Sequence, residues 1–186
     1  MEEHLFTTQG QAYRIRIAPA AEFATEIEAI FAFLIPRAHV EEKYLRNHVP
    51  RALVLAVADF EGAIVSVCAL KDVNHVHSES VRNSSGYPLP LDLPELGYAA
   101  TNEHHFGRQL GRHLNEQIIL RIKGEAFATV RVGNVAEVRN IRRCHFCPKG
   151  QTWDRVDNGG KPYQIALWVR RANAPPICDG APEGVT

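Results

Sequence analysis

The spacing of hydrophobic residues along the chain predicts where strands and helices form. Near the start, Tyr13, Ile15 and Ile17 alternate with arginines, as in a strand with one buried face. Further on, apolar residues recur every three or four positions from Leu110 to Ile122, which is the spacing of one helix face. The same reasoning predicts strands over residues 11–17, 52–58, 63–70, 95–101, 126–132 and 163–171. It predicts helices over residues 19–36, 40–48, 111–124 and 134–144.

The order of these elements indicates an α/β fold. Strands and helices alternate in the second half of the chain, which favours crossover connections and a mixed sheet covered on both faces. Residues 71–94 show no periodicity and carry several serines and three prolines. We therefore expect a long irregular loop there, and loops of that length are usually functional or mobile.

Composition bounds the class of protein. The 186 residues are 45% hydrophobic and 23% charged, as in an ordinary globular protein, and residues 1–171 fit a single domain. The tail, 172–186, is rich in proline, glycine and alanine, so we expect it to be disordered. No apolar run approaches the roughly 20 residues that cross a bilayer, and residues 1–9 lack a signal-peptide core. These features predict a cytoplasmic protein without membrane association.

The charges balance overall but not locally. The chain has 21 basic and 21 acidic residues, yet between His104 and Lys149 nine residues are basic and three are acidic. The basic ones are Arg108, Arg112, Arg121, Lys123, Arg131, Arg139, Arg142, Arg143 and Lys149. A local positive field suits a phosphorylated ligand or nucleic acid, whereas the alternative is a solvated basic surface on two helices.

The turn after the predicted strand at 95–101 has the features of a phosphate-binding loop. Gly107 and Gly111 permit close backbone approach to a ligand, and the first N–H groups of a helix have no intrahelical partner. With the positive end of the helix dipole, these amides favour an anion. We expect a diphosphate on the amides of residues 107–112, with further contacts from Arg108 and Arg112. The alternative is a tight turn that needs glycine for its conformation alone.

Two segments resemble conserved motifs of the GNAT family of N-acetyltransferases. Residues 95–100 and 106–114 resemble motif A, a strand followed by the coenzyme A pyrophosphate loop Gln/Arg-x-x-Gly-x-Gly/Ala. Residues 134–146 resemble motif B, in which Asn134 opens a helix that closes on Phe146. The resemblance follows the family's order over residues 11–171 and is specific from 95 to 153. It implies the GNAT acyl-CoA N-acyltransferase fold, whose mixed, mostly antiparallel sheet is flanked by helices and splays between its fourth and fifth strands.

The sequence departs from the family pattern at four positions. Phe106 stands where motif A has Gln or Arg, and Gln109 stands where it has Gly. His145 replaces the usual Gly before Phe146. Ile141 occupies the position where many members carry a Tyr that protonates the departing thiolate. The resemblance therefore assigns no general acid to this chain.

The resemblance implies direct transfer of an acyl group, most simply acetyl, from acyl-CoA to an amine. Acetyl-CoA or another acyl-CoA is the expected co-substrate, and no metal is expected. A backbone N–H of the 95–101 strand would polarise the thioester carbonyl, and the free backbone of this strand would bind pantetheine. The expected coenzyme A contacts are Ala99, Ala100, Thr101, Phe106, Gly107, Arg108, Gln109, Leu110, Gly111, Arg112 and Asn134.

The proton lost by the acceptor ammonium needs a base. Glu95 is the first candidate, since it begins the central strand near the expected acceptor side, although it would otherwise be an exposed strand-end carboxylate. Tyr98 is a second candidate for catalysis, and the alternative for it is core packing. His75 or His77, which precede the central strand, would shuttle protons or would be exposed histidines without a role.

Other functions remain open from the sequence alone. The spacing Cys144-x-x-Cys147 occurs in zinc sites, but no second pair follows at the required distance, so a zinc-dependent interaction domain is a minor alternative. A nucleobase- or RNA-modifying enzyme and a non-catalytic coenzyme A-binding regulator are the others. Zero net charge favours a small-molecule amine as acceptor. The sequence identifies neither the acceptor, nor the acyl chain length, nor the oligomeric state. A homodimer is compatible with it.

Overall fold

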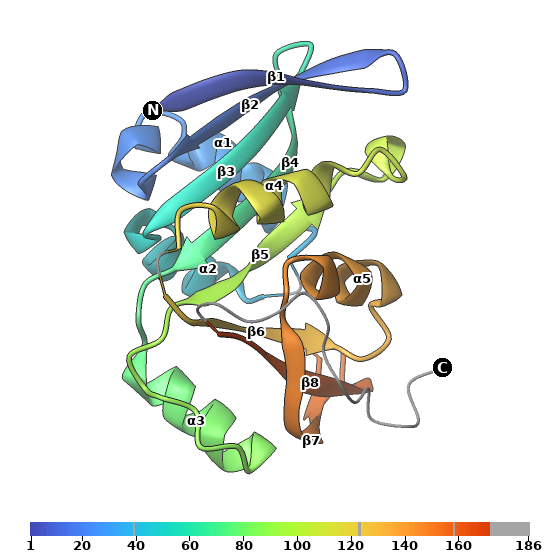
Figure 1. Ribbon diagram of the computed structural model, residues 1–186. Coiled ribbons are helices and arrows are strands. Elements are labelled where there is room, and N and C mark those ends of the chain that lie inside the picture. Colours follow the sequence, from blue (N-terminus) through green and yellow to red (C-terminus); the bar gives the residue numbers. More distant parts are fainter. Residues whose placement is uncertain (39, 123, 158, 172–186) are drawn as a thin grey trace. The chain divides into compact units, whose positions relative to one another are not determined.

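Figure 1 shows the protein as a computed structural model, which describes residues 1–38, 40–122, 124–157 and 159–171. The expected disordered tail, 172–186, lies outside the described residues. Contacts divide the chain into two compact units. The first unit is Met1–Asp72 with Leu96–Arg121, and the second is Val73–Glu95 with the described residues from Ile122 onward. No helix in the described part of the chain is long and apolar enough to cross a membrane.

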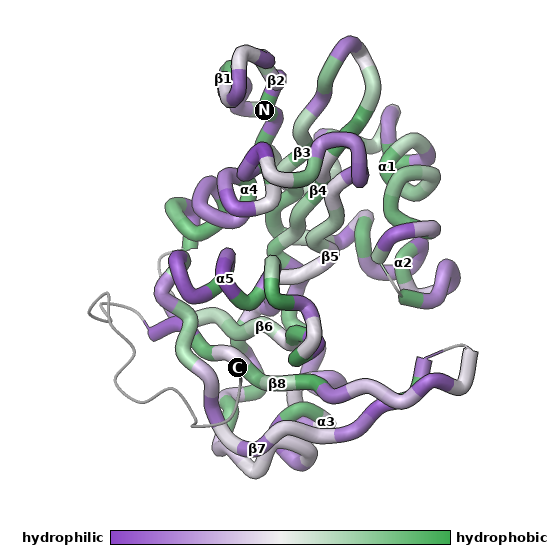
Figure 2. The backbone as a smooth tube through the Cα atoms, turned by 90° about the vertical axis from the view of Figure 1, so that its right-hand side faces the viewer, coloured by the Kyte–Doolittle hydropathy of each residue, from purple (hydrophilic) through white to green (hydrophobic). Residues whose placement is uncertain are grey.

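The first unit combines antiparallel strands with helices. Its strands are β1 (Glu2–Thr8), β2 (Gln11–Ala18), β3 (Val54–Phe60), β4 (Ala63–Lys71) and β5 (Glu95–Thr101). The first residue of β5, Glu95, belongs to the second unit. Its helices are α1 (Ile27–Leu34), α2 (Glu42–His48) and α4 (Leu110–Ile119), with short 3-10 helices at Ala20–Phe23, Val49–Arg51 and Glu103–His105. Helix α4 packs on one face of β3 and β4, and α1 and α2 lie on the other (Figures 1 and 2).

Hydrophobic strands at the centre of this unit form its core. Strands β3 and β4 are hydrophobic over most of their length (Figure 2), and Leu55, Val57 and Ala69 are fully buried. Helix α1 adds Ile30 and Leu34 to the same cluster. The strands predicted at 52–58 and 63–70 correspond to β3 and β4, which pair antiparallel as a hairpin. Glu61 and Gly62 join them with φ values of 51° and 82°, as a two-residue hairpin turn requires.

Two expectations for the first unit are wrong. Residues 2–8 form β1, which pairs with β2, although the sequence predicted no strand there. This edge strand buries little, so it lacks a hydrophobic face to signal it; Leu5 is 73% exposed. The continuous helix expected over 19–36 is instead a 3-10 turn at Ala20–Phe23 followed by α1.

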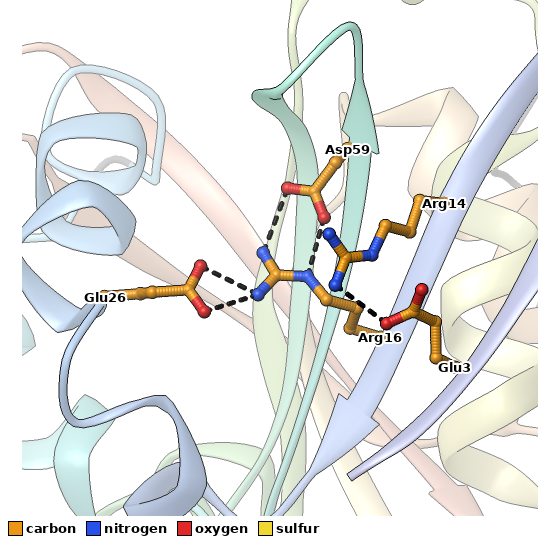
Figure 3. A network of polar contacts seen from close by, with 5 residues as sticks. All are labelled: Glu3, Arg14, Arg16, Glu26 and Asp59. Atoms are coloured by element: carbon orange, nitrogen blue, oxygen red, sulfur yellow. Dashed lines mark hydrogen bonds and ion pairs between the residues drawn. The ribbon is translucent and has the colours of Figure 1, made fainter.

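The break before α1 lies beside a buried charge network (Figure 3). Arg16, on β2, is only 4% exposed, and its guanidinium donates two hydrogen bonds to Asp59, at 2.6 and 3.0 Å. It also donates to both carboxylate oxygens of Glu26, which caps α1, at 2.6 and 2.7 Å. Arg14, two residues away on the same face of β2, is exposed and pairs with Glu3 at 2.8 Å.

The second unit contains the remaining strands and two helices. The strands are β6 (Ala126–Arg131), β7 (Cys147–Val156) and β8 (Pro162–Arg170), and the helices are α3 (His75–Ser85) and α5 (Val135–Arg143). Strand β8 pairs antiparallel with both β6 and β7. A small core forms around Val81, Phe127 and Leu167.

Helix α3 contradicts the irregular loop expected over 71–94. Asn74 caps its start by accepting a hydrogen bond from His77 N at 3.0 Å, and Gly86, with φ of 67°, ends it. The buried residues of the helix are Ser78, Val81 and Ser85. Since two of these are serines, the helical period carries almost no hydrophobic signal in the sequence.

Hydrogen bonding between strands follows the order β1-β2-β3-β4-β5-β6-β8-β7. Strands β5 and β6 are parallel, with Glu95 paired to Phe127, and the five other pairings with a described register are antiparallel. A mixed, mostly antiparallel sheet with helices confirms the α/β class. The Phe127 N–H also donates to Pro94 O at 3.1 Å, which fixes the start of β5. The splay of these strands beyond Glu95 stays a prediction.

Candidate functional site

The turn between β5 and α4 has the conformation of a ligand-binding loop. After the 3-10 helix at Glu103–His105, Phe106 is 66% exposed, and the chain then passes through two left-handed residues. Gly107 has φ of 76° and Gln109 has φ of 62°. Gly107 adopts this conformation without steric cost, whereas Gln109 is strained there by its Cβ. Helix α4 begins immediately afterwards, and its N-cap, Gln109, makes no side-chain cap hydrogen bond.

The amides of this turn are available to a ligand. Among the described residues, the backbone N–H groups of residues 107–112 donate to no protein acceptor. The first helical hydrogen bond runs from His113 N to Gln109 O at 2.9 Å. Unpaired donors at the positive end of a helix are the arrangement that a phosphate cradle requires.

Both arginines of the turn are held by protein groups. Arg108 Nη1 donates to the hydroxyl of Tyr13 on β2 at 2.9 Å. Tyr13 in turn donates to Gln11 at 2.7 Å and lies 3.0 Å from Nδ1 of His105. Burial raises the pKa of Tyr13, an effect that the charge of Arg108 opposes. Burial lowers the pKa of His105, and the charge of Arg108 adds to this shift.

The side chain of Arg112 forms its hydrogen bonds with residues of α4 and its N-cap. Its Nε donates to Glu116 at 2.6 Å and its Nη1 to the side chain of Gln109 at 3.2 Å. These contacts keep the guanidinium within one helical turn of the free amides. Arg108 and Arg112 therefore each already have a protein partner, and their contacts with a diphosphate stay a prediction.

The last residues of β5 lie next to this turn in the first unit. Ala99, Ala100 and Thr101 are half-buried. Ser66 of β4 donates to Ala100 O at 3.0 Å and lies 2.8 Å from the Thr101 hydroxyl. The structure thus brings the expected contacts from 99 to 112 into one unit, whereas Asn134 and Glu95 belong to the other.

Tyr98 occupies the core of the first unit. It is 5% exposed, belongs to the main hydrophobic cluster, and lies under the ammonium of Lys71, 4.5 Å from the ring centroid. Its φ of 50° is unusual for a residue within a strand and marks a local distortion of β5. A catalytic role for Tyr98 stays a prediction, and the packing fits the structural alternative.

Glu95 is buried rather than exposed at the strand end. Its side chain is 5% exposed, so the alternative of a solvated carboxylate is wrong. Oε1 accepts a hydrogen bond from the Thr129 hydroxyl at 2.6 Å. Oε2 lies 3.2 Å from Nε2 of His77, in the first turn of α3. A carboxylate and an imidazole therefore meet inside the second unit.

Sequence reasoning missed this pairing. It treated His75 and His77 as loop residues, but both lie on α3. Asn74 and Gly86 were the available signals, because Asn before a helix and Gly after it are typical caps. No sequence feature indicated that His77 would meet Glu95, since that contact depends on where α3 packs.

The remaining candidates of the second unit are structural in the described residues. Asn134 caps α5 by accepting a hydrogen bond from Glu137 N at 3.1 Å, as expected. Ile141 is fully buried and offers no acid. Cys144 is buried and is not disulfide-bonded, whereas Cys147 is, so the two do not form a pair of thiolate ligands. In the part of the chain that the structure describes, no group of three or more His, Cys, Asp or Glu side chains is arranged to hold a metal.

Comparison with known proteins shows a shared fold. No protein-family model and no curated protein matches this sequence. The ribosomal-protein-S18-alanine N-acetyltransferase of Escherichia coli matches with a TM-score of 0.61 and 14% identity, over 90% of this chain and 98% of that one. A GNAT-family acetyltransferase from Streptococcus pneumoniae matches with a TM-score of 0.58 and 17% identity, over 86% and 99%. YncA of Salmonella typhimurium, whose structure contains acetyl-CoA, matches with a TM-score of 0.57 and 15% identity, over 91% of this chain and 99% of that one.

Proposed function

We propose that this chain, which has the fold of the GNAT acetyltransferases, is an N-acyltransferase that moves an acetyl-type group from acyl-CoA to an amine. The observation that carries the proposal is the β5–α4 turn. Its backbone N–H groups at residues 107–112 have no acceptor among the described residues, and they stand at the positive end of α4. A coenzyme A diphosphate matches these donors in charge and in hydrogen-bonding capacity.

The residues of the turn fit this substrate. Gly107 is exposed, and no atom lies within 4 Å of where a side chain would begin, so its backbone is open to a ligand. Arg108 and Arg112 add positive charge on either side of Gln109. Backbone groups of Ala99 and Ala100 would hold pantetheine in the manner of a neighbouring strand.

The chemistry we propose is direct attack by the amine. The neutral amine adds to the thioester carbonyl carbon, a backbone N–H of β5 stabilises the oxygen, and the C–S bond then breaks. The acceptor enters as an ammonium ion, so one proton must leave before attack. The carboxylate of Glu95 and its imidazole partner are the proposed route for that proton. Ile141 supplies no acid, so the departing thiolate takes the second proton lost by the amine nitrogen.

A small-molecule amine is the proposed acceptor. The chain carries no net charge. Several residues of the basic 104–149 segment are engaged within the protein: Arg108 with Tyr13, Arg112 with Glu116, Arg121 with Glu2, Arg131 over Tyr163 and Arg142 over Trp168. The pairing of Arg121 with Glu2, together with zero net charge, leaves less unpaired positive charge for a nucleic acid, which makes a polyanionic acceptor the weaker alternative.

A thiol-release screen tests this function. Acetyl-CoA is offered with a library of small amines, and free coenzyme A thiol is measured with and without protein. We expect release that depends on the amine, with the acetylated amine confirmed by mass spectrometry. Calorimetric binding of coenzyme A without release for any small, peptide or nucleic-acid amine would identify a non-catalytic coenzyme A-binding protein instead. Absence of binding would exclude both.

A further inference from the structure

His77 and Glu95 form a carboxylate–imidazole pair in the second unit. The His77 Nε2 atom lies 3.2 Å from Glu95 Oε2, a distance typical of an ion pair. The Nε2 atom is buried and makes no aligned hydrogen bond in this state. Catalytic hydrogen bonds are often poorly aligned before substrate binds and tighten in the complex, so this geometry is compatible with a working pair.

Glu95 is fixed but enclosed. Its other carboxylate oxygen accepts from the Thr129 hydroxyl at 2.6 Å, and its backbone pairs with Phe127. The side chain is only 5% exposed. A base must come within hydrogen-bonding reach of the proton that it removes, and an enclosed carboxylate with both oxygens engaged is poorly placed for this.

His77 connects this carboxylate with the surface. Its Nε2 atom is buried beside Glu95, whereas 33% of its side chain is exposed. The ring therefore extends from Glu95 to the protein surface. Asn74 fixes its backbone through the helix cap, and its ring stacks on Phe127 with 6.2 Å between centroids. The imidazole is thus held on two sides and open on a third.

We propose that His77 removes the proton from the acceptor ammonium and that Glu95 is a positioning residue acting through it. This inference rests on the proposed N-acyltransferase function. Glu95 favours the tautomer of His77 with hydrogen on Nε2, which leaves the lone pair of Nδ1 for the substrate. The arrangement has the logic of the Asp–His half of a catalytic triad, in which a buried carboxylate orients the base.

The proton balance of the step is complete. His77 Nδ1 takes one proton from the ammonium and becomes an imidazolium, which Glu95 stabilises. The free amine forms the C–N bond, the C–S bond breaks, and the second nitrogen proton goes to the thiolate. The imidazolium then releases its proton to water, so the net products are the amide, coenzyme A thiol and one proton.

Several ionisable residues lie on the elements that pack around His77. From β5 it faces Glu95, and α3 itself also carries the ionisable residues His75, Glu79 and Arg82. From β7, Arg155 reaches α3 at Ser80, at 3.5 Å. The carboxylate of Glu95 lies 3.2 Å from the His77 ring nitrogen Nε2.

Kinetics of matched variants test the role of His77. With the amine found by the screen, His77→Gln keeps a donor toward Glu95 but cannot accept the proton, so we expect kcat to fall about 10²-fold. The KM for acetyl-CoA should be unchanged, and the acidic limb of the kcat/KM profile should disappear. His75→Gln, on the same helix, should behave as the wild type. Glu95→Gln should lower kcat less, and adding it to His77→Gln should change nothing further.

The outcomes separate the possibilities. If His77→Gln retains the wild-type rate and pH profile, the inference is wrong while the acyltransferase proposal stands. If Glu95→Gln costs more than His77→Gln, Glu95 is itself the base. If no amine releases thiol from the wild type, both proposals fall.

A spectroscopic arm distinguishes a pairing role from a purely structural one. In ¹⁵N-labelled protein, neutral His77 should carry its hydrogen on Nε2, and Glu95→Gln should remove this preference, because an amide donates as well as accepts. Hydrogen on Nδ1, or a tautomer that Glu95→Gln leaves unchanged, would overturn the proposed action of Glu95.

Discussion

The guanidinium of Arg108 is hydrogen-bonded to the hydroxyl of Tyr13, 2.9 Å away. This contact joins the turn after β5 to β2, and the two residues are 95 positions apart in the sequence. A binding loop that is already held by its scaffold loses less conformational freedom when its ligand arrives. The proposed cradle is therefore held in place by the fold of the first unit.

An acidic residue at Gly111 should separate helix stability from anion binding. An aspartate in the first turn of α4 is favourable for the helix dipole and replaces a flexible glycine. The same carboxylate repels a diphosphate on the free amides. We expect Gly111→Asp to keep or raise the melting temperature and to weaken coenzyme A binding at least about tenfold in calorimetry. Gly124→Asp is the charge control, and equal weakening by it would argue against the cradle.

Relieving the backbone strain at Gln109 should stabilise the protein. A residue with a Cβ in the left-handed region costs about 1 kcal/mol relative to glycine. Gln109→Gly should therefore raise the free energy of unfolding by up to about 1 kcal/mol and should preserve coenzyme A affinity. Glu61→Gly, in the β3–β4 turn with φ of 51°, should give a similar gain without touching the site. Urea unfolding checks both, and a loss of stability specific to Gln109→Gly would show that its side-chain contact with Arg112 matters more than the strain.

The buried charge network of β2 should dominate the stability of the first unit. Arg16→Met leaves Asp59, whose side chain is 11% exposed, without its partner, and breaking a buried pair costs about 3–5 kcal/mol. Arg14→Met removes the exposed pair with Glu3, for which about 0–1 kcal/mol is expected. Both arginines are drawn in Figure 3, and urea unfolding of the two variants should show this contrast. Equal losses would mean that Arg16 is not effectively desolvated.

Stability should fall when the pH drops below neutrality, in part because of His113. Burial lowers the pKa of His113, and the charges of His4 and Arg112 lower it further, while Glu116 opposes the shift. As the pH falls, the unfolded chain therefore takes up this proton first, near the ordinary histidine pKa of 6.5. The folded state loses stability as the pH falls below that value. His113→Phe retains the stacking on Phe6 and should flatten the change in unfolding free energy between about pH 7 and pH 5. An unchanged slope would assign the effect to other groups.

The sequence predicted the elements whose burial is carried by large apolar side chains. Strand β2 and helix α5 were predicted close to their observed bounds because their apolar residues alternate or recur at helical spacing. Strands β3 and β4 were predicted from continuous apolar runs, since both of their faces are buried. Helix α3 was not, since Ser78 and Ser85 fill its buried face. Near Ser85, the backbone of Gly150 comes so close that a side chain there would collide, so small residues take the place of a hydrophobic stripe.

The candidate site likewise has some features that the sequence predicted and others that it did not. The free amides of the β5–α4 turn follow from local rules for glycine and helix starts, so the sequence sufficed to predict them. The pairing of His77 with Glu95 joins residues of different elements through the packing of α3, and the contact of Arg108 with Tyr13 joins residues of the first unit that are distant in sequence. No local pattern specifies contacts of that kind.

The central claim is that the amides of residues 107–112 bind the diphosphate of coenzyme A. Titration of ¹⁵N-labelled protein with coenzyme A, and separately with pantetheine, which lacks the diphosphate, tests it residue by residue. We expect coenzyme A to move the amide signals of residues 107–112 strongly and pantetheine to leave them nearly unchanged. If these signals stay in place while calorimetry shows the protein saturated with coenzyme A, the cradle is not at this turn and the account is contradicted.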